Sequence, residues 1–196
     1  ADRPFNEVDS LALAQLSYAR MPVNVPRLDA EATDVDLAMV GVRDLLRAEC
    51  YDDMFGKVWS PSMNVDLLRA MCESPRWRDL RVGGYVDEFD PETTKQFSAC
   101  VFDVGDGSSY VAFRGTDSTI VGWKEDFAMA FRRPVAAQES AARYLADIAG
   151  RRDGPLMVGG HSKGGNLAVY AAANAPAAVQ ERLIAVFCHD GPGFDA

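Results

Sequence analysis

A serine between two pairs of glycines is the residue of this sequence best suited to covalent chemistry. Ser162 lies in the stretch GGHSKGG, between the apolar run LMV and the alanine-rich stretch NLAVYAAANA. The pattern G-x-S-x-G at a strand-to-helix turn is typical of a nucleophilic serine held in a strained turn. Glycines at 160 and 164 would let strand and helix approach, and the helix N-terminus favours negative charge beside the serine.

The same turn has a structural alternative. A glycine-rich turn between a strand and a helix also serves packing or phosphate binding. A Walker P-loop is excluded, because Gly165 stands where the lysine of that motif should follow. The strand–turn–helix context favours the nucleophile over a purely structural turn.

A second motif lies upstream at Phe113-Arg114-Gly115-Thr116, followed by Trp123 and Asp126. F-R-G-[ST], a later W-x-x-D and then G-H-S-x-G-G together resemble the class 3 lipases, a branch of the α/β-hydrolases. The opening FNEVDSLALAQLSY and the closing HDGPGF resemble a bacterial family of uncharacterised, lipase-like cytoplasmic proteins.

The resemblance implies roles for three residues. Ser162 would be the nucleophile, and the backbone N–H groups of Thr116 and Lys163 would form the oxyanion hole, with the Thr116 hydroxyl as support. Thr116 could instead be a turn threonine that satisfies its own backbone. Arg114 and Asp126 are candidates for an ion pair that braces the loop.

The proton acceptor of such a site is harder to find, because the chain contains only two histidines. In α/β-hydrolases the acid and then the histidine follow the serine in the chain. His161 is expected to pack beside the serine turn. His189 ends the next strand, where the fold places neither acid nor base, and Asp190 is either the acid or a turn residue in HDGPG.

Three explanations of the missing base remain open. The chain is a fragment of a longer hydrolase, or a non-catalytic hydrolase-like domain that binds a ligand or a protein, or a hydrolase that uses His189 in a rearranged site. The first is favoured, and a C-terminal segment or a partner chain is then expected to cover the sheet edge. The favoured function is hydrolysis of a carboxylic ester, lipid or thioester through an acyl-enzyme on Ser162.

The order of the helices and strands expected around these residues predicts an α/β fold. We expect an α/β-hydrolase-like, mostly parallel sheet flanked by helices, in one domain over residues 1–196. A helical part over 1–78 would precede a sheet core over 79–196. Helical spacing predicts helices from Asp9 or Ser10, from Thr33, and before Pro75. The expected strands cover 81–90, 96–105, 108–115, 155–160 and 183–191, with helices over 138–150 and 164–175.

Composition excludes several classes of function. The net charge of -9 opposes nucleic-acid binding. No apolar run approaches the ~18 residues of a membrane helix, and the first residues do not resemble a signal peptide. Four scattered cysteines indicate free thiols in the cytoplasm. Two histidines and those cysteines form no ligand cluster, so no metal or cofactor is expected.

Overall fold

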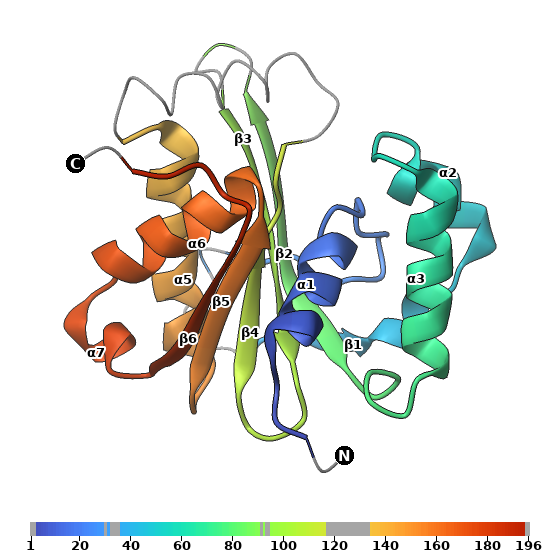
Figure 1. Cartoon of the computed structure of the whole chain (residues 1–196), viewed down its shortest axis with the longest axis horizontal. Helices are drawn as coiled ribbons and strands as arrows, with labels where there is room; N and C mark the ends of the chain where they lie inside the picture. The colour runs from blue at the N-terminus through green and yellow to red at the C-terminus, as the bar shows by residue number, and fades with distance from the viewer. Residues whose placement is uncertain are drawn as a thin grey trace.

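A six-stranded mixed sheet forms the centre of the computed structural model (Figure 1). The structure describes residues 3–29, 31, 36–90, 92, 95–116 and 134–194. The strands lie in sequence order across the sheet: β1 (Met39–Gly41), β2 (Arg81–Asp90), β3 (Lys95–Asp103), β4 (Ser109–Phe113), β5 (Leu156–His161) and β6 (Leu183–His189).

The expectation of a mostly parallel sheet is wrong. β1 with β2, β2 with β3, and β3 with β4 pair antiparallel, and only β4 with β5 and β5 with β6 pair parallel. The reason is connection length. A tight turn joins β3 to β4 and forces them antiparallel, whereas the parallel strands β5 and β6 are separated by α6 (Lys163–Asn174) and α7 (Ala177–Gln180).

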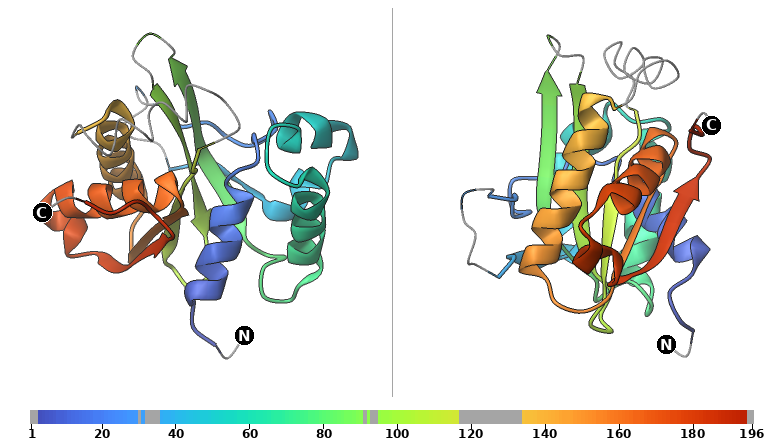
Figure 2. Two further views of the ribbon diagram at one scale, coloured as in Figure 1. Left: turned by 45° about the horizontal axis from the view of Figure 1, so that its top comes forward. Right: turned by 90° about the vertical axis from the view of Figure 1, so that its left-hand side faces the viewer.

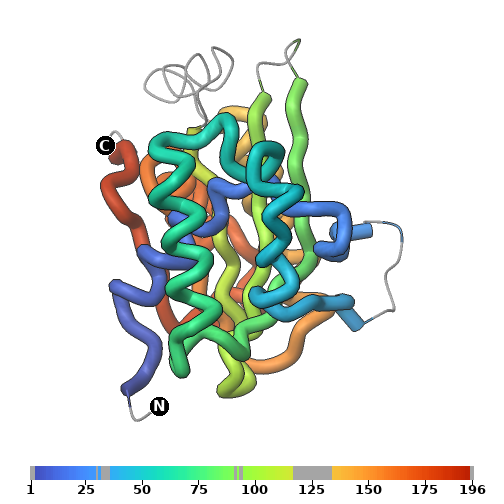
Figure 3. The backbone as a smooth tube through the Cα atoms, turned by 90° about the vertical axis from the view of Figure 1, so that its right-hand side faces the viewer, coloured from blue at the N-terminus to red at the C-terminus, as the bar shows by residue number. Residues whose placement is uncertain are grey.

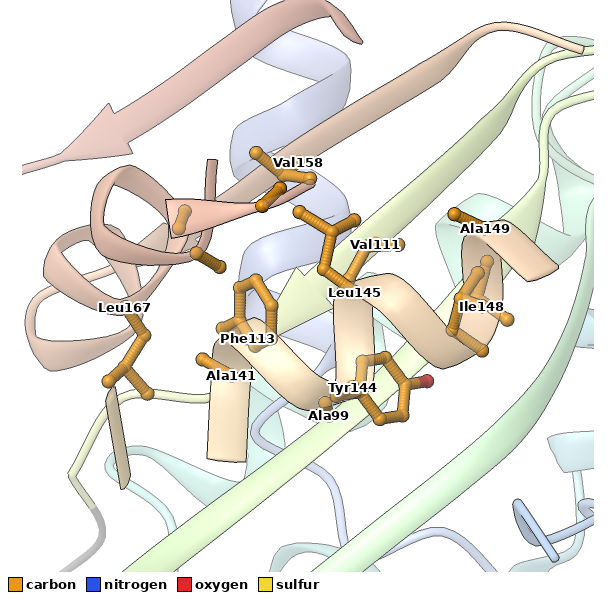
Figure 4. Close-up of a cluster of buried hydrophobic side chains, with 14 of the residues drawn as sticks. Ala99, Val111, Phe113, Ala141, Tyr144, Leu145, Ile148, Ala149, Val158 and Leu167 are labelled. Atoms are coloured by element: carbon orange, nitrogen blue, oxygen red, sulfur yellow. The ribbon is translucent and has the colours of Figure 1, made fainter. Parts of the chain in front are cut away.

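Helices cover both faces of the sheet (Figures 1 and 2). α5 (Ala136–Arg151), α6 and α7 lie on one face. Figure 4 shows Tyr144, Leu145 and Ile148 of α5 among buried side chains that include Val111 and Phe113 of β4. Side chains alternate along a strand, so Tyr110 and Ala112 of β4 are buried in the core on the opposite face.

The opposite face is covered by the N-terminal helices α1 (Glu7–Leu16), α2 (Tyr51–Phe55) and α3 (Pro61–Glu73). Buried Leu13 and Leu16 of α1 share a core cluster with Leu68 and Met71 of α3. α3 lies on the outer side of α1, as Figures 1 and 3 show. These helices pack over the sheet, and the N-terminal part of the chain also supplies the edge strand β1 to the sheet itself.

Two predicted helices in this layer differ from the structure. The helix expected from Thr33, a residue outside the described part of the chain, is replaced at 39–45 by β1 and a 3₁₀ turn over Val42–Leu45. Pairing of β1 with β2 outweighs the local helical spacing. α1 begins earlier than expected, because Asn6 rather than Asp9 caps it and accepts from the backbone N–H of Val8. α3 ends before Pro75, as predicted.

Candidate active site

Ser162 occupies the turn between β5 and α6, where the sequence predicts it. Its backbone has φ 55° and ψ −129°, in a region that side-chain-bearing residues rarely adopt. The Ser162 N–H donates a hydrogen bond of 2.8 Å to the carbonyl oxygen of His189, which ties the turn to the end of β6. Such strain costs of order 1–3 kcal/mol and persists only where the surroundings enforce it.

The flanking glycines allow this turn, as their spacing predicts. A Cβ on Gly160 would lie 2.4 Å from the carbonyl carbon of Gly164 and 2.5 Å from the Phe113 oxygen. A Cβ on Gly164 would lie 2.1 Å from that same oxygen. Because real Cβ contacts are never so short, no side chain fits at either position without moving backbone.

A cavity of about 300 Å³ opens at Ser162. Its lining comes from the carboxyl ends of neighbouring strands and from the N-terminal layer. The described residues that line it are Gln15, Tyr18, Val58, Trp59, Thr116, His161 and Ser162. Thr116 and Ser162 therefore share one cavity, and a nucleophile in a concave site is the usual arrangement of an enzyme active site.

Parallel pairing brings the two sequence motifs together. Phe113 of β4 pairs with Gly160 of β5, so the chain leaves both strands at the same edge of the sheet. A Cβ on Gly115 would lie 2.7 Å from the backbone oxygen of His161 and 2.0 Å from the Tyr18 hydroxyl, so a side chain there would force both to move. Lys163 is the first residue of α6, and its buried ammonium donates to the carbonyl oxygen of Gln96 at 2.9 Å. The oxyanion-hole roles of Thr116 and Lys163 stay predictions.

Both histidines make contacts with the N-terminal layer. Nδ1 of His161 lies 2.9 Å from the Tyr18 hydroxyl, and Nε2 of His189 lies 2.9 Å from Oγ of Ser10. Burial, and to a lesser degree the neighbouring His161, lower the pKa of His189, which favours the neutral ring. Within the described residues no hydrogen bond joins either ring to the Ser162 hydroxyl.

The carboxylates of the sequence motifs are placed as follows. Asp190 is exposed directly after β6, with φ 52°, and its role as the acid stays a prediction. Arg114 is buried and pairs with Asp87 of β2 at 2.9 Å, which anchors the end of β4 to the antiparallel half of the sheet. Its expected partner Asp126, like Trp123, lies outside the described residues.

Sequence reasoning missed the part of the cavity that the N-terminal layer supplies. We call Gln15, Tyr18, Val58 and Trp59 the N-terminal wall. These residues are distant from Ser162 in the chain and match no catalytic motif. Two signals were present: Gln15 and Tyr18 lie in the stretch FNEVDSLALAQLSY, whose family resemblance assigned them no role, and Trp59 comes just before a Ser-Pro helix start.

Other kinds of site have less support in the described part of the chain. No group of three or more His, Cys, Asp or Glu residues there could hold a metal ion. None of the helices described has the length and apolar character needed to cross a membrane. All four cysteines are free thiols.

The comparisons with known proteins agree with this geometry. Residues 71–196, more than half of the chain, match the family model described as Mbeg1-like. No curated protein and no solved structure matches the chain. The match includes both sequence motifs and the serine turn, and it leaves out the N-terminal wall. This chain belongs to the Mbeg1-like family, a lipase-like family related to the α/β-hydrolases.

Proposed function

We propose that this chain is a serine hydrolase that cleaves a carboxylic ester, lipid or thioester through an acyl-enzyme on Ser162. The observation that carries the proposal is the left-handed backbone of Ser162 between β5 and α6, at a cavity. Non-glycine residues in that conformation gather at functional sites, where the strain is part of the mechanism. The free thiols support action in the reducing cytoplasm.

The reaction has two steps. Ser162 Oγ forms a bond to the acyl carbon while its proton passes to a base, and the bond from that carbon to the alcohol or thiol breaks, with the leaving group taking a proton. Water then attacks the acyl-enzyme, which releases the carboxylic acid and restores the serine. In both steps negative charge develops on the carbonyl oxygen.

The backbone N–H groups of Lys163 and Thr116 are the donors proposed for that oxygen. Lys163 is the first residue of α6 and directly follows Ser162, and Thr116 lines the same cavity as Ser162. Donors fixed before the reaction stabilise the transition state without reorganising. Losing one such donor typically costs ~2.7–4 kcal/mol.

The proton acceptor is proposed to come from a further segment or a partner chain that packs against β6. Two observations support this. First, the described hydrogen bonds of the His161 and His189 rings go to Tyr18 and Ser10. Second, the side chains of Ile184 and Val186 on β6 are exposed. Asp190, which follows β6, is the acid proposed within the chain. A covered sheet edge is the usual state of a folded protein.

A second candidate function is binding without turnover. The hydrogen bonds that occupy both histidines favour it, because a serine without a base is a poor nucleophile. Hydrolysis of p-nitrophenyl butyrate distinguishes the two. The hydrolase proposal expects residues 1–196 to accelerate this hydrolysis only at the trace level, ~10³–10⁴-fold over water, that the oxyanion hole and binding give without a base. No acceleration over buffer would favour the binding domain.

Thr116→Val tests the oxyanion hole separately. We expect kcat for p-nitrophenyl butyrate to fall while KM and the melting temperature stay nearly constant, because the hydroxyl acts mainly in the transition state. Ser62→Ala, at an exposed position of α3, is the control. An unchanged kcat would mean that Thr116 is only a turn residue.

A further inference from the structure

The N-terminal wall combines an exposed aromatic side chain with a fixed backbone. Trp59 lines the Ser162 cavity and yet leaves 75% of its surface exposed. A tryptophan exposed at a cavity is unusual, because its large apolar surface is normally covered. Tryptophan is also enriched where proteins recognise ligands and partners.

The backbone at Trp59 is fixed by a strained residue and a buried amide. Ser60, the next residue, has φ 52° and is one of three non-glycine residues with positive φ in the described chain, the others being Ser162 and Asp190. Asn64 is buried and donates to the carbonyl oxygens of Trp59 at 2.8 Å and Ser60 at 3.1 Å.

Asn64 also connects this loop to α1. Its Oδ1 accepts a hydrogen bond of 2.8 Å from Nε2 of Gln15, which lies in α1 and lines the same cavity. The loop before α3 is therefore pinned from both sides, and its strain is enforced by these bonds. A rigid backbone that presents an exposed ring lowers the entropy cost of binding.

The chemistry of the cavity selects the class of ligand. None of the described residues that line the Ser162 cavity is an aspartate, glutamate, lysine or arginine. A neighbouring cavity of about 260 Å³, which shares Tyr18 and Val58, is lined instead by charged side chains, among them Arg20, Asp87 and Arg114. An uncharged, apolar group fits the first cavity better than the second.

We infer that Trp59 is the selectivity-determining residue of this site, an aromatic platform for a short, uncharged acyl chain. This inference rests on the proposed function, because the acyl group stays bonded to Ser162 Oγ in the intermediate and must fit the cavity that contains Ser162. The volume of about 300 Å³ lies at the small end of ligand cavities, which fits a short chain rather than a long one.

The test compares two neutral probes that differ only in chain length, ethyl p-nitrophenyl methylphosphonate and ethyl p-nitrophenyl hexylphosphonate. Ser162 Oγ forms a bond to phosphorus while its proton passes to the base, and the bond to p-nitrophenolate breaks, so intact mass gives the rate constant for each probe. We expect Trp59→Ala to lower the hexyl-to-methyl rate ratio about tenfold, since about two methylenes lose their contact with the ring. Trp59→Phe should retain most of the ratio. Met63→Ala removes an exposed side chain outside the cavity and should keep the wild-type ratio.

A second measurement does not depend on the nucleophile. In Ser162→Ala, the fluorescence of Trp59, isolated by subtracting the spectrum of Ser162→Ala/Trp59→Phe, should change saturably with 2-octanone and not with acetone. If no probe labels Ser162 even with the further segment or partner chain that supplies the base present, but this change occurs, the proposed function fails and the apolar subsite stands. A wild-type rate ratio in folded Trp59→Ala, or no fluorescence change with 2-octanone, would overturn the inference.

Discussion

The serine turn and the N-terminal wall face the same cavity but are held in place by different forces. Around Ser162 the backbone itself is packed so closely that Gly160 and Gly164 admit no side chain. The N-terminal wall is held by side chains instead, through Gln15 to Asn64 and Tyr18 to His161. The family match covers the first region and not the second. The proposed chemistry would thus depend on an inflexible backbone, and the proposed selectivity on side-chain contacts that substitution can alter.

The largest expected loss of stability comes from forcing apart the closely packed backbone at the serine turn. Gly160→Ala should lower the free energy of unfolding by about 3 kcal/mol or more, because the new Cβ would lie 2.4 Å from the Gly164 carbonyl carbon. Urea unfolding measures the change. Gly150→Ala is the control, since no atom lies within 4 Å of a Cβ there. It should stabilise α5 by about 0.5–1 kcal/mol. Equal stabilities of the two variants would contradict this reading.

The next largest expected loss of stability comes from breaking the hydrogen bonds that hold α1 in the N-terminal layer. Asp9 of α1 is buried and accepts hydrogen bonds from Arg76 and Trp77. Burial alone would raise the pKa of Asp9, but the bonds from Arg76, Asn6 and Trp77 outweigh it and lower the pKa. Asp9→Ala should cost about 3 kcal/mol, the lower end for a buried pair that loses one partner.

The matched control for Asp9→Ala is an exposed ion pair. Arg43 and Asp79 lie 2.8 Å apart with both side chains more than half exposed, so Asp79→Ala should cost less than about 1 kcal/mol. Hydrogen exchange should then be faster in α1 of Asp9→Ala and unchanged in α6. Faster exchange spread evenly over both helices would mean that the two regions are not separable.

A smaller change in stability, a gain rather than a loss, is expected at Ser162 itself. Ser162→Gly should raise the free energy of unfolding by about 1 kcal/mol, because glycine adopts φ 55° without strain and this gain exceeds its greater entropy in the unfolded chain. Ser62→Gly, within the first turn of α3, should instead lose roughly 0.5 kcal/mol. A loss of stability in Ser162→Gly would mean that the serine turn stores no strain.

These differences also explain how far the sequence could predict the structure. The turn at Ser162 and its strand and helix follow from local signals, namely an apolar run, paired glycines and an alanine-rich stretch. The close approach of Gly160 to Gly164 follows as well, because no other residue type allows it. The parallel alignment of β4 with β5 then brings Thr116 to the same cavity.

For the N-terminal wall, the resemblance of FNEVDSLALAQLSY to a family did not indicate that Gln15 and Tyr18 would line the cavity. Gln15 and Asn64 are 49 positions apart and meet only in the folded chain. Residues 39–41 have helical spacing, yet they form β1 because β2 offers a strand to pair with. Arg114 pairs with Asp87, 27 positions before it in the chain, a contact that no local pattern indicated. Long-range side-chain contacts of this kind leave no pattern in the sequence.

Labelling with a fluorophosphonate tests the central claim most directly. With the proposed further segment or partner chain present, the probe should modify one residue, Ser162, as located by peptide mass spectrometry, because among the described serines this one alone combines a strained turn, a helix N-terminus and a cavity. The label should vanish in Ser162→Ala and persist in Ser62→Ala. Equal labelling of the wild-type chain and Ser162→Ala would contradict the assignment of Ser162 as the nucleophile.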